Sequence, residues 1–111
     1  MSYDRNRLFQ SASDFFLHHG SAGMKLRPAA AFEVCEQAFK HGLLVVRVEG
    51  GIWHEPGFEA RIDCIWDGLT PPIADREAEE NNRRAAKFVQ EEQFAHSAFI
   101  ITTMALREKT L

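Results

Sequence analysis

The hydrophobic residues change their spacing at Gly42, and this change restricts the fold more than any other feature of the sequence. Residues 28–41 carry apolar side chains at helical spacing: Ala31, Val34, Cys35 and Ala38. Residues 43–49 are rich in branched side chains, and one face of the expected strand holds Leu44, Val46 and Val48. Pro28 suits a first helical turn, and Gly42 suits a left-handed C-terminal cap. The sequence therefore predicts a helix that leads directly into a strand.

The rest of the chain divides by the same two kinds of spacing. The expected elements are, in chain order, a helix over residues 3–19, a linker over 20–23, the helix 28–41, the strand 43–49, a loop over 50–58, a strand over 59–66, a helix over 74–93 and a strand over 97–106. The strand over 59–66 is expected to turn every second side chain inward: Ala60, Ile62, Cys64 and Trp66.

From residue 24 onward, the expected elements have the order α-β-β-α-β. This order predicts an α+β fold, a two-layer sandwich in which two helices cover a three-stranded, mainly antiparallel sheet. The N-terminal helix is additional to this order, and Met24 resembles a second initiation methionine. We therefore expect residues 1–23 to form a helical extension and linker, and residues 24–111 to form the domain proper.

Length and charge exclude several classes of protein. The 111 residues suit one domain, and they include 13 Lys and Arg against 16 Asp and Glu. Proteins that neutralise nucleic-acid phosphates usually present a basic surface, so a net charge of -3 argues against direct nucleic-acid binding. No apolar run reaches the roughly 18–20 residues that cross a bilayer, and residues 1–20 lack the pattern of a secretory signal. We expect a cytoplasmic protein without a membrane partner, with Cys35 and Cys64 as reduced core residues.

The spacing of reactive residues predicts neither a metal site nor a catalytic site. No pair of histidines has the spacing of a zinc signature, so no metal or other cofactor is expected. Cys64 faces inward on a strand and has no activating partner nearby in the sequence, which makes it a poor nucleophile. We therefore expect no catalytic residue and no enzyme. An enzyme would require the fold to gather Cys64, Asp63 or a histidine in one pocket.

Two segments are candidates for binding a partner. The loop over 50–58 displays aromatic side chains around Pro56-Gly57, and it either contacts a partner or folds its Trp53 back onto the core. The start of the helix over 74–93 is acidic, which the helix dipole explains unless the acidic side chains form a recognition patch. The residues that we expect to bind a partner are Trp53, His54, Glu55, Phe58, Trp66, Asp67, Asp75 and Glu79.

A series of short motifs from Met24 onward resembles a known family. They are MKL-P-AA-EVC-A-K-GL over residues 24–43, GG-W with PGF over 50–58, Trp66, ENNR over 80–83 and AFIIT over 98–102. In this order and spacing they resemble the immunity proteins of the type-five E-group colicin, a toxin whose nuclease domain cleaves tRNA in the anticodon loop. Residues 1–23 are additional to that family, and residues 59–67 and 68–79 differ from it in most positions.

The resemblance implies an inhibitor that binds the tRNase domain of a colicin-like toxin and occupies its anticodon cleft as a mimic of the RNA. The alternative is a small non-enzymatic regulatory module that forms homo-oligomers. In that case the N-terminal helix, with Leu8, Phe15 and Phe16, packs against a second copy and forms a homodimer. The same helix could instead complete the core of its own domain.

Overall fold

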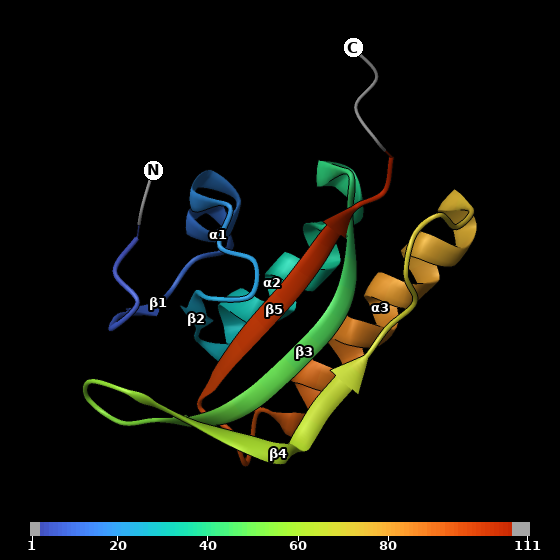
Figure 1. Cartoon of the computed structure of the whole chain (residues 1–111). Coiled ribbons are helices and arrows are strands. Elements are labelled where there is room, and N and C mark those ends of the chain that lie inside the picture. Colours follow the sequence, from blue (N-terminus) through green and yellow to red (C-terminus); the bar gives the residue numbers. More distant parts are fainter. Residues whose placement is uncertain (1–2, 108–111) are drawn as a thin grey trace.

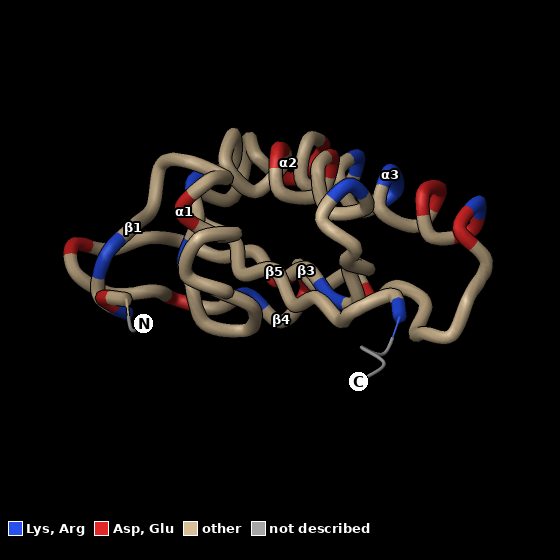
Figure 2. Tube along the Cα trace, turned by 90° about the horizontal axis from the view of Figure 1, so that it is seen from above, with Lys and Arg blue, Asp and Glu red and all other residues tan. Residues whose placement is uncertain are grey.

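A five-stranded sheet with the order β1-β2-β5-β3-β4 forms one layer of the protein, and α2 and α3 lie side by side on one face of it (Figures 1 and 2). The computed structural model describes residues 3–107. Its elements are β1 (Leu8–Phe9), α1 (Ala12–His18), β2 (Lys25–Leu26), α2 (Pro28–Gln37), the 3-10 helix η1 (Phe39–His41), β3 (Leu43–Trp53), β4 (Phe58–Asp67), α3 (Asp75–Glu92) and β5 (Ala98–Ala105). The predicted α+β class is confirmed.

Strands β4, β3 and β5 form the antiparallel part of the sheet that the sequence predicts. The structure adds β2, which is antiparallel to β5, and β1, which is parallel to β2. Each added strand has only two residues, and two residues are too short to produce a recognisable alternation. The number of strands is therefore five rather than three.

The change of spacing at Gly42 marks a real boundary. The α-helix ends at Gln37, and one 3-10 turn follows before β3 begins at Leu43. Gly42 has a φ of 73° and its N–H donates to the carbonyl oxygen of Phe39 at 2.9 Å. A left-handed residue without a Cβ is favoured at this cap. The predicted helix, cap and strand are confirmed, although the last turn of the helix is tighter than expected.

The helix predicted over residues 3–19 is wrong in its first half. Only Ala12–His18 is helical, because Leu8 and Phe9 are extended and pair with β2. The hydroxyl oxygen of Ser11 accepts the backbone N–H of Asp14 at 3.3 Å, which starts the helix there. Leu8 and Ala12 continue the helical spacing of the residues that follow them, so spacing alone does not locate this start.

The N-terminal segment contributes side chains to the common hydrophobic core. Phe9, Ala12 and Phe15 are buried together with residues of α2, α3 and the sheet. Residues 20–23 form a turn in which the N–H of Gly23 donates to the carbonyl oxygen of Gly20 at 3.3 Å, and the N–H of Ala22 donates to the carbonyl oxygen of Ile101 at 3.1 Å. Phe16 stacks on His41, with ring centroids 3.7 Å apart. The division of the chain at residue 23 and the homodimer both stay predictions.

The loop predicted over residues 50–58 is mostly strand. Strand β3 continues to Trp53 and β4 begins at Phe58, which leaves a turn of four residues at the tip of a long hairpin. The three glycines in this segment and Pro56 favour irregular structure in a prediction from the sequence. The hairpin tip nevertheless projects from one end of the sheet (Figure 1).

Two irregularities in pairing change which side chains face inward. The register between β3 and β5 shifts around Val46, so Val45 is buried while Val46 is only partly buried. On β4, residues 61–64 lie between the paired positions Ile65 and Ala60, and Ile62 is 90% exposed instead of inward-facing. Cys64 and Trp66 follow the predicted inward direction, with Cys64 fully buried.

Candidate functional site

The tip of the β3–β4 hairpin gathers four of the eight predicted partner-binding residues, Trp53, His54, Glu55 and Phe58. Trp53 and Phe58 are paired across the two strands. The N–H of His54 donates to the carbonyl oxygen of Gly57 at 2.8 Å, and Gly57 has a φ of 136° that favours glycine. The hairpin therefore holds two aromatic rings next to a short, hydrogen-bonded turn.

Hydrogen bonds and ion pairs fix the polar side chains at this tip. The indole Nε1–H of Trp53 donates to Oε2 of Glu55 at 3.4 Å. Nε2 of His54 lies 2.9 Å from Oε1 of Glu59, and Nε of Arg61 lies 3.1 Å from its Oε2. The hydrogen bond with His54, followed by the charge of Arg61, lowers the pKa of Glu59. The tip thus combines aromatic rings with carboxylates that are held in place.

The two tryptophans differ in their relation to the core. Trp66 is partly buried and packs against the core cluster, so it has a structural role. Trp53 is also partly buried, but within the described residues it is not among the side chains that pack on that cluster. Its backbone N–H donates to the hydroxyl oxygen of Ser97 at 2.8 Å, which ties the hairpin to the residue before β5. The position of Trp53 favours contact with a partner over a role as a lid on the core.

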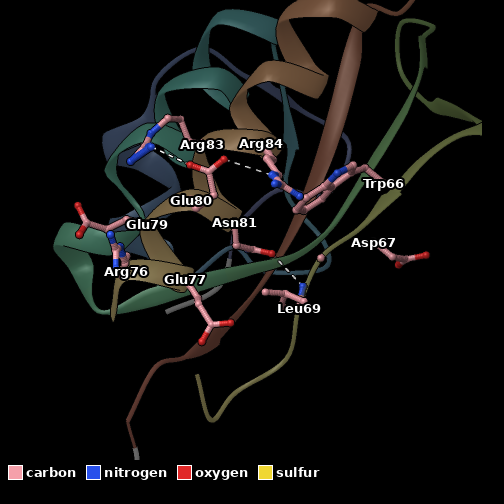
Figure 3. A pocket seen from close by; sticks show the side chains of 11 residues that line it. Trp66, Asp67, Leu69, Arg76, Glu77, Glu79, Glu80, Asn81, Arg83 and Arg84 are labelled. Atoms are coloured by element: carbon pink, nitrogen blue, oxygen red, sulfur yellow. Dashed lines mark hydrogen bonds and ion pairs between the residues drawn. The ribbon is translucent and has the colours of Figure 1, made fainter. Parts of the chain in front are cut away.

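A hollow of about 770 Å³ separates the end of β4 from the first half of α3 (Figure 3). It is lined by three further predicted residues, Trp66, Asp67 and Glu79. Gly68 also lines it, and a Cβ at this position would lie 2.7 Å from Oδ1 of Asn81. The same Oδ1 accepts the backbone N–H of Leu69 at 2.8 Å, which fixes the loop beyond β4 to the helix. A hydrogen bond between the loop and α3 therefore joins the two sides of the hollow.

The charges around this hollow are mixed, with an acidic majority. Its charged residues are Asp67, Glu77, Glu79, Glu80, Arg76, Arg83 and Arg84, and both signs follow one another along α3 (Figure 2). Arg83 and Arg84 both pair with Glu80, at 2.9 Å and 3.3 Å. In the part of the chain that the structure describes, Glu77 and Glu79 make no ion pair, so their charges face solvent.

Asp67 and Asp75 are placed differently from the acidic residues of the helix. In Figure 3, Asp67 points away from the α3 side chains, and its Oδ1 pairs with Nε of Arg47 at 2.7 Å. Asp75 lines a separate hollow together with Phe16 and His41, and its Oδ1 lies 2.8 Å from Nη2 of Arg107. The eight predicted residues thus occupy three places: the hairpin tip, the hollow and the start of α3. Their contact with a partner stays a prediction.

Sequence reasoning missed two residues that shape this surface. Arg47 is a charged residue within a run of branched ones, which is a signal of an exposed position on a strand. Asn81 is 4% exposed, and its amide group accepts the backbone N–H of Leu69 and donates to the carbonyl oxygen of Val45. Asn81 belongs to the ENNR motif, but the sequence does not indicate which segments its amide group contacts.

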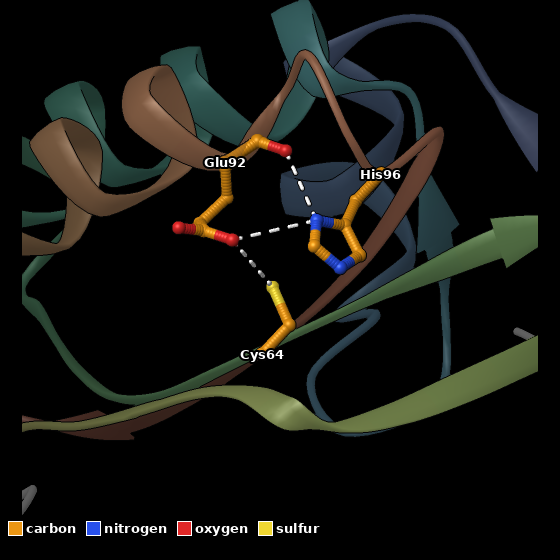
Figure 4. A group of neighbouring side chains, drawn as sticks. All are labelled: Cys64, Glu92 and His96. Carbon is orange, nitrogen blue, oxygen red and sulfur yellow. Dashed lines mark hydrogen bonds and ion pairs between the residues drawn. The ribbon is translucent and has the colours of Figure 1, made fainter.

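The fold gathers Cys64, Glu92 and His96 (Figure 4), which is the kind of cluster that an enzyme would require. The thiol of Cys64 donates to Oε1 of Glu92 at 3.6 Å. Burial, followed by the charge of Glu92, raises the pKa of Cys64 to about 11. Burial also raises the pKa of Cys35. A thiol that stays protonated at neutral pH is a poor nucleophile, so the cluster does not support a cysteine enzyme.

Comparison with known proteins connects this surface to a biological class. The immunity protein CdiI of Burkholderia pseudomallei is 54% identical over 102 residues, which cover 92% of this chain and 94% of that protein. Two Escherichia coli proteins, the colicin-E5 immunity protein and the colicin-E5 immunity protein in ColE9, are each 39% identical over 80 residues, covering 71% of this chain and 96% of theirs. These similarities define a bacterial immunity protein, a class that protects against a toxin.

The family can be stated more narrowly. The family model described as Colicin-E5 Imm protein matches residues 24–104, so the chain belongs to the colicin-E5 immunity protein family. The similarity to CdiI covers most of the segment before residue 24 as well, whereas the match to the E. coli proteins covers less of the chain. Among the described residues, no helix has the length and apolar character needed to cross a membrane.

Proposed function

We propose that this protein binds the tRNase domain of a cognate colicin-like toxin and blocks it as a mimic of the RNA substrate. It acts in the cytoplasm, where the tRNA is, and it catalyses no reaction itself. Membership of the colicin-E5 immunity family over residues 24–104 carries this proposal. The shared class predicts a protein partner, and the geometry of the surface suggests how that partner is recognised.

The hairpin tip supports the idea of RNA mimicry. Single-stranded RNA offers flat bases for stacking and negatively charged phosphates on one flexible backbone. Trp53 offers a flat ring whose Nε1–H lies 3.4 Å from a carboxylate oxygen of Glu55, and Phe58 adds a second ring across the hairpin. The tip therefore presents a ring and a negative charge at adjacent positions, as a nucleotide does.

The charge of the second surface fits the same partner. A cleft that binds RNA phosphates must be basic, and a complementary inhibitor is acidic. The chain has a net charge of -3, and Glu77 and Glu79 face solvent beside the hollow. Such complementarity mainly increases the association rate and selects against wrong partners. Related colicin DNase–immunity pairs are among the tightest protein complexes, so we expect strong binding here.

The direct test uses the C-terminal domain of the toxin encoded beside this protein's gene. A catalytically inactive form of that domain is titrated with the full-length protein by calorimetry. We expect a dissociation constant below about 10 nM. The nuclease domain of a DNase-type colicin should show no binding under the same conditions. Absence of a complex at micromolar concentration would reject this toxin as the partner.

A further inference from the structure

Three side chains with metal-binding atoms meet where β4 faces the end of α3 (Figure 4). Sγ of Cys64 lies 3.6 Å from Oε1 of Glu92, and Nδ1 of His96 lies 3.5 Å from the same oxygen. Nδ1 of His96 also lies 3.1 Å from the backbone oxygen of Glu92. Glu92 is the last residue of α3 and His96 lies four residues later, in the turn before β5, while Cys64 comes from the irregular part of β4.

We propose that Cys64, Glu92 and His96 form a binding site for one divalent transition-metal ion of the Zn²⁺ type. The combination of a thiolate, an imidazole and a carboxylate suits zinc, whereas calcium and magnesium prefer oxygen ligands alone. A tetrahedral zinc ion with bonds of about 2.0–2.3 Å holds its ligand atoms about 3.3–3.7 Å apart. The sulfur–oxygen and nitrogen–oxygen distances in this cluster fall in that range.

The surroundings of the cluster are built to place the sulfur. Gly50 lies against Cys64, and a methyl group at Gly50 would collide with Sγ. The same side chain would also come within 3.0 Å of the Phe99 ring. Cys64 is fully buried, and the ring of Phe99 lies 6.4 Å from that of His96. The absence of a side chain at Gly50 therefore creates the space that the thiol occupies.

The cluster has an entry path from solvent. The His96 side chain is 11% exposed and the Glu92 side chain is 36% exposed, so solvent reaches the site from the side of Glu92. A water molecule would complete a tetrahedral coordination. Binding displaces the thiol proton, which is released to solvent, and the cation replaces that proton as the partner of the Glu92 carboxylate. Nδ1 of His96 gives up its hydrogen bond to the backbone oxygen of Glu92, and the neutral imidazole then carries its proton on Nε2.

A bound ion would connect the base of the β3–β4 hairpin to the segment between α3 and β5. This segment contains His96 and, next to it, Ser97, whose hydroxyl oxygen accepts the backbone N–H of Trp53. The ion would therefore stiffen the support of the hairpin tip. The inference rests only on the geometry of the cluster, and it holds whether or not the tip binds a toxin.

Zinc binding to the full-length protein tests the proposal. The protein is prepared without a histidine tag, stripped with a chelator and titrated against a chromophoric zinc indicator. We expect one zinc site with a dissociation constant below about 1 µM. Cys64→Ser and His96→Gln should each increase this dissociation constant at least about tenfold. The matched controls are Cys35→Ser, which changes the other buried thiol, and His54→Gln, which changes an imidazole paired with Glu59; both should bind zinc as the parent protein does.

Cobalt provides a second readout in the folded parent protein. A thiolate-to-cobalt charge-transfer band identifies Cys64 as a ligand, and it should persist in Cys35→Ser. This band decides the role of Cys64 even if Cys64→Ser fails to fold, and His96→Gln then decides the role of the imidazole. Binding weaker than about 1 µM, or equal binding by His96→Gln and the parent protein, overturns the proposal.

Discussion

The side-chain oxygen of Asn82 accepts the backbone N–H of Val45 at 2.9 Å, across the interface between α3 and β3. Nδ2 of the same side chain donates to the carbonyl oxygen of Leu43 at 3.0 Å, and Nδ2 of Asn81 donates to that of Val45 at 2.8 Å. The pairing between β3 and β4 begins only at Arg47, so the asparagine amides satisfy the backbone of β3 before that point. The side-chain amides of Asn81 and Asn82 thus take the place of the neighbouring strand that β3 lacks before Arg47.

Replacing Asn82 by leucine should therefore destabilise the fold. Asn82→Leu leaves the N–H of Val45 and the carbonyl of Leu43 buried without their partner, at a cost of about 2–4 kcal/mol in the free energy of unfolding. Urea denaturation measures this loss. The exposed Gln90 on the same helix is the control, and Gln90→Ala should change stability by less than about 0.5 kcal/mol. Equal effects of the two substitutions would contradict the bridging role.

Residues at the N-terminus should contribute to the stability of the whole domain. Phe15 is 1% exposed within the common core, so Phe15→Ala should lower the free energy of unfolding by about 3–5 kcal/mol. The control is Leu17→Ala on the same helix, where the side chain is 62% exposed. Its free energy of unfolding should change by less than about 0.5 kcal/mol. A small effect of Phe15→Ala would support a separable extension instead.

The hairpin tip should respond to acid through Glu59. Its folded pKa lies below the usual value because of His54 and Arg61, so the stabilisation from these contacts is present above the unfolded pKa. It is lost as the pH falls through the folded pKa. Carboxyl NMR shifts should give a depressed midpoint for Glu59, and His54→Ala, which removes the hydrogen-bond donor, should raise that midpoint. An unchanged midpoint in His54→Ala would show that the hydrogen bond is not the main cause.

Trp53 is the residue of the hairpin tip with the largest expected effect on toxin binding. Trp53→Ala should weaken the complex by about 2 kcal/mol, roughly a thirtyfold increase in the dissociation constant, without unfolding the domain. The control is Phe32→Ala, which removes a partly buried ring on α2. Calorimetry with the inactive toxin domain measures both variants. An affinity unchanged by Trp53→Ala would assign Trp53 to the scaffold.

The sequence predicts those parts of the fold that repeat with a regular period. The helix before Gly42, the strand after it and the helix α3 all have long stretches of regular spacing. The short pair β1 and β2 has no such stretch. The exposed position of Ile62 depends on an irregular pairing between strands, and strict alternation assumes that pairing is regular.

The candidate site is predictable from the sequence only in part. Trp53 and Phe58 stood out because large aromatic residues flank a Pro-Gly turn, and the structure brings them together at one tip. Contacts between distant segments gave no such signal. Asn81 reaches the loop beyond β4, and His96 reaches Cys64, only because the tertiary fold brings these elements together. Spacing along the chain does not contain that information.

Competition between RNA and this protein for the toxin is the most direct test of substrate mimicry. A catalytically inactive toxin domain is loaded with a fluorescent anticodon stem-loop and titrated with the full-length protein. If the protein occupies the anticodon cleft, the RNA should be released completely, and the active toxin should stop cleaving tRNA at an equimolar ratio. A stable ternary complex of toxin, RNA and this protein would contradict the account.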